Sequence, residues 1–202
     1  MASGYPHAAR ADRLRVVRRV DWRFLLARPH LGAVAYLGRH DSALVAALRE
    51  VSDDVALDAA TAEADRHDLV VAVAPTRTEL ALAPALLRPG GWIYVETGGL
   101  LRRPRRAGAL RGASACVRAL RALGFEDAAA HWHFPDFASC LEIVPLDDVR
   151  TLELSLRRRQ RTPATQTRVL AARLALGLRI LPHVVPAASV VARLPQAATG
   201  RP

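Results

Sequence analysis

Short apolar runs alternate with amphipathic stretches along most of the chain. Several of these runs are closed soon afterwards by a glycine or a proline, which is typical of short buried strands. Between the runs, apolar residues recur at helical spacing, as they do after Asp41 or Ser42, either of which can cap a helix. We therefore expect strands at residues 33–37, 55–58, 69–73 and 92–96, and helices beginning near 42 and at 79–87 and 110–123. This alternation predicts an α/β fold in which a mostly parallel sheet carries helices on both faces.

The pattern changes near Pro145. Two more strands are expected before it, at 128–134 and 139–144, while helices follow at about 149–161 and 165–181. A strand-like run at 188–194 comes last. These shifts divide the sequence into an N-terminal arm at 1–30, an α/β domain at 31–146 and a helical C-terminal extension at 147–202, which we expect to pack on the same domain.

The composition fits one domain whose core is built from small and aliphatic side chains. The chain has 202 residues, of which 51% are hydrophobic and only 5% aromatic. Its formal net charge is +10, yet all 29 basic residues are arginine, a bias typical of a GC-rich genome. The arginines are spread along the chain and few aromatic residues are present to stack on bases, so nucleic acid is not the expected partner.

The cysteines and the apolar segments indicate a cytoplasmic protein. Cys116 and Cys140 lie far apart without metal-ligand spacing, so neither a disulfide framework nor a zinc site is expected. The first residues lack the apolar segment of a secretory signal. No apolar run reaches the length of a membrane span, so none is expected.

Two stretches in the middle of the chain resemble class I S-adenosylmethionine-dependent methyltransferases. Residues 68–73 read DLVVAV and residues 86–96 read LLRPGGWIYVE, which is similar to the family's fourth and fifth strands with the turn between them. Residues 120–125, LRALGF, resemble the lead into the family's last antiparallel hairpin. The resemblance covers about residues 33–145. It implies a Rossmann-like fold, S-adenosylmethionine as cofactor and a methyltransferase of bacterial type that acts on a small molecule.

The resemblance also implies where the cofactor would bind. Gly38 corresponds to the first glycine of the family's cofactor turn, so Gly38 and the following Arg39, His40 and Asp41 are candidate cofactor residues. Asp58 lies where the family often places the carboxylate that binds the ribose, although a capping aspartate at a strand end is an equal interpretation.

The cofactor motif is incomplete in this sequence. Tyr36 stands at the family's acidic position, and His40 and Ser42 replace two later glycines. The alternative hypothesis is therefore a non-catalytic homologue that keeps the fold and acts as a binding or partner subunit, with a small molecule or a protein as its partner.

The family's third strand, an edge strand, is expected to be missing. Only nine residues separate Asp58 from Asp68, and a helical crossover alone takes about 10–12 residues.

His131 and His133 are the candidate catalytic residues. Alternation along a strand places both imidazoles on one face, where a histidine near neutral pKa can act as a general base. Half of a metal site and ordinary strand-end histidines are the alternatives, and no third metal ligand is identifiable. Glu96 and Thr97 lie at the end of the strand expected at 92–96. By topology they face the same ligand-binding crevice as the turn at Gly38. The arginines at 102–106 and 157–161 are interpreted as solvated, with phosphate or carboxylate binding by the first group as the alternative.

Overall fold

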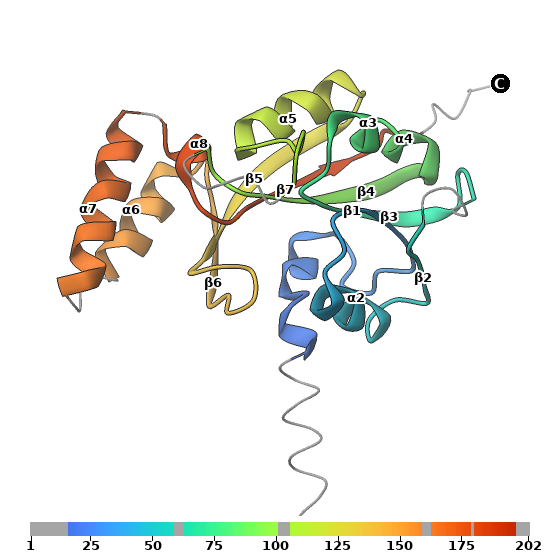
Figure 1. The fold of residues 1–202 in the computed structure, drawn as a ribbon, viewed down its shortest axis with the longest axis horizontal. Coiled ribbons are helices and arrows are strands. Elements are labelled where there is room, and N and C mark those ends of the chain that lie inside the picture. The colour runs from blue at the N-terminus through green and yellow to red at the C-terminus, as the bar shows by residue number, and fades with distance from the viewer. Residues whose placement is uncertain (1–15, 59–62, 101–105, 159–162, 179, 197–202) are drawn as a thin grey trace, which may run out of the picture.

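The chain folds around one seven-stranded mixed sheet. The computed structural model describes residues 16–58, 63–100, 106–158, 163–178 and 180–196 (Figure 1). The order of strands across the sheet is β2-β1-β3-β4-β7-β5-β6. Their bounds are β1 Ala33–Gly38, β2 Asp54–Ala56, β3 His67–Val73, β4 Leu87–Thr97, β5 Glu126–Phe134, β6 Glu142–Pro145 and β7 Ala188–Arg193. Strands β2, β1, β3 and β4 run parallel, whereas β7 is antiparallel to both of its neighbours and β6 is antiparallel to β5.

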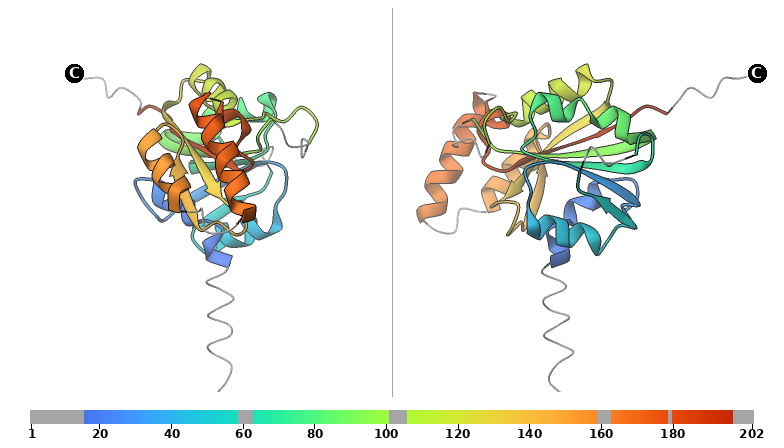
Figure 2. Two further views of the ribbon diagram at one scale, coloured as in Figure 1. Left: turned by 90° about the vertical axis from the view of Figure 1, so that its left-hand side faces the viewer. Right: turned by 45° about the vertical axis from the view of Figure 1, so that its right-hand side comes forward.

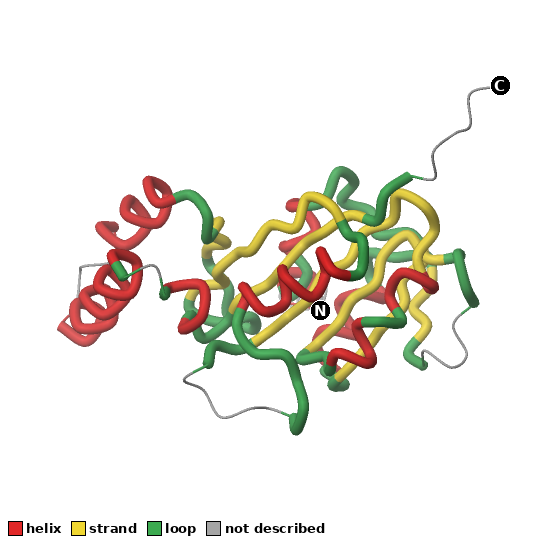
Figure 3. Tube along the Cα trace, turned by 90° about the horizontal axis from the view of Figure 1, so that it is seen from above, coloured by secondary structure: helices red, strands yellow, loops and turns green. Residues whose placement is uncertain are grey.

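Helices cover both faces of the sheet, as the alternating pattern predicts. The 3-10 helix η1 and α2 lie on one face, and α3, α4 and α5 lie on the other (Figures 1 and 2). Helices α6 and α7 stand to one side beyond β6 (Figure 3). The bounds are η1 Asp21–Leu25, α2 Ser42–Arg49, α3 Arg77–Leu80, α4 Ala83–Leu86, α5 Ala113–Ala122, α6 Val149–Arg158, α7 Pro163–Gly177 and α8 Leu181–Val184. In the part of the chain that the structure describes, no helix is both long and apolar enough to cross a bilayer.

The hydrophobic core has two layers because side chains alternate along the strands. In β3, Val70 and Ala72 face the α3–α5 side, while Val71 and Val73 face η1 and α2. All four are essentially inaccessible to solvent. The central strands are therefore buried on both faces, which explains their continuous apolar runs.

The predicted central strands are confirmed. Val34, Tyr36, Val71, Val73, Ile93 and Val95 lie in the neighbouring parallel strands β1, β3 and β4. The short link after β2 is consistent with the expected loss of the family's third strand, because β3 pairs directly with β1 and, among the described residues, β2 pairs with β1 alone. No helix or strand occurs at residues 63–66, while residues 59–62 lie outside the described part of the chain.

Several element boundaries differ from the sequence prediction. The helix expected at 165–181 ends at Gly177 and is followed by the short α8, and the strand expected at 139–144 is β6, Glu142–Pro145. The single helix expected at 79–87 is two short helices, α3 and α4, because Pro84 opens a new turn at the start of α4. Strand β4 begins at Leu87, so the run Arg88–Gly91 that was expected to stop a helix belongs to the strand. Helix α5 begins at Ala113, after Gly112, which adopts a φ of +79°.

The C-terminal strand lies inside the sheet. β7 pairs with β4 on one side and with β5 on the other, so it separates β4 from the β5–β6 hairpin. The boundary expected between residues 146 and 147 therefore cuts through one sheet. Local patterning shows that 188–194 is a strand, but it does not show which strands it joins.

Candidate functional site

The carboxyl ends of the parallel strands form the edge where this class of fold binds ligands. After β1 the chain passes through α2 to β2 on one side, then returns to β3 on the other side of β1. The strand order therefore reverses between β1 and β3. In open α/β sheets the crevice beyond this reversal is the usual ligand site. Gly38, Val73 and Glu96 are at or near the carboxyl ends of the three strands around it.

Arg19, from the segment before η1, lies across this crevice. Its Nη1 and Nη2 donate to the two carboxylate oxygens of Glu96 at 2.6 and 2.7 Å, and Nη2 also donates to Asp41 Oδ2 at 3.3 Å. Asp41 follows β1 and Glu96 is near the end of β4, with β3 between these strands. The guanidinium therefore bridges the carboxyl end of β3.

The ions of this bridge are deeply buried. The Glu96 and Arg19 side chains are 1% and 7% exposed. Burial lowers the pKa of Arg19, but the hydrogen bonds and charge of Glu96 outweigh it and hold that pKa above its ordinary value. Burial raises the pKa of Asp41, while the Leu44 N–H and the Arg19 charge bring it below the ordinary value. Arg19 and Asp41 are therefore both charged at neutral pH.

Aromatic side chains surround the bridge. Trp22 stacks on Tyr94 with ring centroids 3.7 Å apart and planes 6° apart, and the Tyr94 hydroxyl donates to Glu96 Oε1 at 3.0 Å. The Phe137 ring lies 5.5 Å from the Arg19 guanidinium carbon. Tyr36 donates its hydroxyl to the Arg39 carbonyl at 2.7 Å. Burial, together with the Glu96 and Asp41 carboxylates, raises the pKa of Tyr36, so this phenol stays protonated.

The predicted cofactor residues come together at this edge, and several already have structural partners. Gly38 has a φ of +86°, and a Cβ there would lie 2.3 Å from the Val73 carbonyl oxygen. The Arg39 N–H donates to that same carbonyl at 2.7 Å. Asp41 caps α2 by accepting from the Leu44 N–H. His40 and Asp58 are exposed, and Asp58 follows β2 beside β1.

The residues around the Arg19 bridge do not fit S-adenosylmethionine. The close approach that fixes Gly38 as a glycine is to the neighbouring strand β3, which leaves nothing for a cofactor to explain. Tyr36, at the position where the resemblance implies a carboxylate, is protonated and bonded within the turn. The partly buried Asp41 and the buried Glu96 both pair with Arg19.

His131 and His133 share one face of β5, as the alternation predicts, and both are poor proton acceptors. Burial, followed by the Arg19 charge and His131, lowers the pKa of His133 to about 3. Burial also lowers the pKa of His131. His133 Nε2 lies 2.8 Å from Ser189 Oγ. A serine–histidine pair can form a nucleophile, but both side chains are buried here, so no substrate reaches the hydroxyl in this conformation.

The metal and cysteine predictions have the following outcomes. Among the described residues, no three histidine, cysteine, aspartate or glutamate side chains gather in a way that would hold a metal ion. Cys116 and Cys140 are both free thiols, as expected. Of the arginine-rich groups, residues 102–105 and 159–161 lie outside the described part of the chain.

The sequence reasoning missed the part played by the N-terminal arm. Residues 1–30 were assigned to an arm outside the α/β domain, yet Val20 and Trp22 of this arm are buried in the core and Arg19 reaches the centre of the crevice. Glu96 was placed at the crevice, but its partner was not foreseen. The available signal was the apolar pair Val20 and Trp22 beside a charged residue.

Comparisons with known proteins give similarity at the level of the fold. No protein-family model matches the sequence, and no curated protein matches it. A Thermotoga maritima S-adenosylmethionine-dependent methyltransferase, a possible histamine N-methyltransferase, is 10% identical with a TM-score of 0.49, covering 92% of this chain and 95% of that chain. An S-adenosylmethionine-dependent methyltransferase from Archaeoglobus fulgidus is 13% identical with a TM-score of 0.48. The match covers 94% of this chain and 100% of that chain. Phosphoethanolamine N-methyltransferase 2 of Haemonchus contortus, in complex with S-adenosyl-L-methionine, is 14% identical with a TM-score of 0.45. The match covers 92% of this chain and 53% of that chain, so this chain spans about half the length of the Haemonchus protein.

Proposed function

We propose that this protein is a non-catalytic homologue of methyltransferase fold that acts by binding a small molecule or a partner protein. The observation that carries the proposal is the Arg19 bridge. It places a buried guanidinium over the carboxyl end of β3, between two carboxylates at the topological switch point.

The energetics of the bridge support this function. Separating a buried ion pair leaves the remaining charge without compensation, which costs about 3–5 kcal/mol in proteins. A cofactor entering between Asp41 and Glu96 would have to supply that free energy in addition to its own desolvation.

The competing function is methyl transfer to a small molecule with S-adenosylmethionine as cofactor. The exposed Asp58 favours it, because it follows β2 at the carboxyl edge, beside the strand β1 that ends at Gly38. In that case the Asp58 carboxylate would accept the ribose hydroxyls. His131 or His133 would be the base, and their lowered pKa values argue against this role.

Calorimetric titration of the full chain with S-adenosylmethionine and S-adenosylhomocysteine separates the two functions. The proposal predicts no saturable heat up to millimolar concentrations of either compound. Saturable binding below that range would overturn it. In that event Asp58→Ala tells where the cofactor sits, since loss of a charge-assisted hydrogen bond costs about 1.5–3 kcal/mol. Glu153→Ala, on the exposed face of α6, is the matched control.

A further inference from the structure

A hollow of about 750 Å³ lies at the opposite edge of the sheet from the Arg19 bridge. Its walls come from the amino ends of β1, β3 and β4 and from the end of the antiparallel β7. Residues before β1 close one side. A hollow of this size matches the volume of ordinary small-molecule sites. The sequence gives no sign of it, because its lining residues are far apart along the chain.

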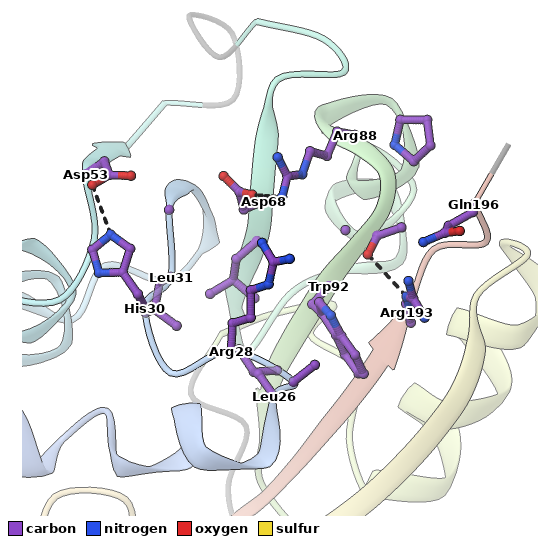
Figure 4. A pocket seen from close by; sticks show the side chains of 16 residues that line it. Leu26, Arg28, His30, Leu31, Asp53, Asp68, Arg88, Trp92, Arg193 and Gln196 are labelled. Carbon is purple, nitrogen blue, oxygen red and sulfur yellow. Dashed lines mark hydrogen bonds and ion pairs between the residues drawn. The ribbon is translucent and has the colours of Figure 1, made fainter.

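Three arginines from separate elements reach this hollow. Arg28 precedes β1, Arg88 is the second residue of β4 and Arg193 ends β7. Figure 4 shows Arg28 and Arg88 approaching Asp68 from different sides, with Arg193 across from them beyond Trp92. Guanidinium groups suit phosphate and carboxylate groups, because each offers several N–H donors in a fixed plane.

The carboxylates of the hollow are already matched. Asp68 pairs with Arg88 and also accepts the Ala33 N–H at 2.9 Å. Asp53 Oδ1 lies 2.9 Å from His30 Nε2. Within the part of the chain that the structure describes, Arg28 and Arg193 make no ion pair. Two cations therefore remain available on the two sides of the hollow.

The remaining walls suit a phosphate attached to a flat group. Arg193 is held in place because its Nε donates to the Gly90 carbonyl at 3.3 Å. Gly90 lies in the same wall, where a Cβ would come within 3.4 Å of Arg193 Nη2, so its lack of a side chain leaves room for that guanidinium. The partly exposed Trp92 ring also lines the hollow, with the Arg193 guanidinium carbon 5.9 Å from its centroid, and it offers a surface on which a ring can stack.

We propose that this hollow binds a phosphate monoester of a ring compound, with Arg28 and Arg193 holding the phosphate and Trp92 stacking on the ring. This site does not depend on whether the carboxyl edge binds a cofactor. Adenosine monophosphate is a suitable probe because it carries one phosphate and one flat base. Inorganic phosphate and adenosine separate the two halves of the interaction.

Binding of the three probes to the full chain at low salt tests the proposal. Adenosine monophosphate should bind at least about fivefold more tightly than inorganic phosphate, because stacking of one base contributes about 1–3 kcal/mol. Adenosine should bind far more weakly than its monophosphate. If adenosine and adenosine monophosphate bind with equal affinity, the proposed role of the arginines is wrong. If inorganic phosphate and adenosine monophosphate bind with equal affinity, the proposed role of Trp92 is wrong.

Matched variants distinguish binding at a specific site from general attraction of an anion to a positively charged protein. Arg28→Ala and Arg193→Ala should each weaken adenosine monophosphate binding about 10- to 100-fold. Arg118→Ala removes the same charge from the exposed face of α5 and should leave binding within about twofold. Arg28 lies on an exposed segment outside the sheet, so its replacement leaves the fold intact. Equal effects of Arg28→Ala and Arg118→Ala, or no binding at millimolar concentration by the folded protein, would refute the site.

Discussion

Single charged and polar side chains determine the character of the carboxyl edge. Glu96 is nearly inaccessible to solvent, and it is tolerated there because Arg19 and Tyr94 together supply three hydrogen bonds to its carboxylate. Each member of the group needs the others, since a buried ion without a partner is strongly unfavourable. Arg19 is therefore a structural residue of the crevice.

The buried His133 should make the stability of the protein depend on pH. Its pKa is about 3 in the folded chain, against about 6.5 for an ordinary histidine. Between these values only the unfolded state binds the proton, so the free energy of unfolding should fall as the pH is lowered from about 6 to about 4. The slope due to this residue approaches about 1.4 kcal/mol per pH unit. Urea unfolding at both pH values measures it.

His133→Gln isolates this contribution. The variant keeps a side-chain hydrogen-bonding group near Ser189 but does not titrate, so its stability should fall less steeply with acid than that of the natural chain. His40→Gln, at an exposed position, should retain the steeper dependence. An unchanged slope in His133→Gln would contradict a neutral, buried His133.

At the scale of the elements, the sequence predicts the central strands well and the edges of elements poorly. The runs around Val34, Val71 and Val95 are apolar on both faces, a local property that pattern alone detects. The start of β4 at Leu87 was missed because its Pro-Gly-Gly sequence favours a turn, whereas pairing of Leu87 with His67 and the hydrogen bond from the Leu194 N–H to the Gly91 carbonyl keep this segment in the sheet. Pairing with distant strands also decides the place of β7, and no local pattern contains that information.

The candidate site was predicted only in part, because local pattern identifies residues that follow a strand but not contacts between distant segments. Asp41, Glu96 and Gly38 follow recognisable strands, so topology alone brings them to one edge. Arg19 comes from a segment without a regular pattern, and its position depends on the packing of Val20 and Trp22 beneath the sheet. The arginines of the amino edge belong to three elements whose proximity exists only in the folded chain.

The turn that joins β1 to α2 requires glycine for reasons of packing. Gly38 and Gly124 share a φ of +86°, but a Cβ would lie 2.3 Å from the Val73 carbonyl oxygen at Gly38 and would meet nothing within 4 Å at Gly124. Both alanine variants should lose about 1–2 kcal/mol from the left-handed conformation. Gly38→Ala should lose about 1–3 kcal/mol more, as overpacked sites do.

Denaturant unfolding of Gly38→Ala and Gly124→Ala measures this difference directly. A larger loss at Gly38 means that its replacement weakens the fold whether or not a cofactor binds nearby, so loss of cofactor binding in such a variant would not identify a contact. Equal losses for the two variants would show that the approach to β3 is unimportant.

At the scale of the whole molecule, the two edges of the sheet differ in the side chains they present. The carboxyl edge, where this architecture usually binds ligands, is closed by the N-terminal segment through Arg19 and Trp22. The amino edge carries a hollow with two arginines that lack an ion pair among the described residues. The account therefore predicts that ligands bind at the amino edge and leave the carboxyl edge undisturbed.

The most direct test observes the three tryptophans, because Trp22 lies at the carboxyl edge and Trp92 lies at the amino edge. Trp22 belongs to the Arg19 cluster, Trp92 lines the hollow and Trp132 lies on β5. Fluorine NMR of the protein labelled with 5-fluorotryptophan, assigned by single Trp→Phe variants, reports each site during a titration. Adenosine monophosphate should shift the Trp92 resonance in a saturable way, and millimolar S-adenosylmethionine should leave the Trp22 resonance unchanged. A saturable shift of Trp22 with S-adenosylmethionine, while Trp92 responds to neither compound, would contradict the account.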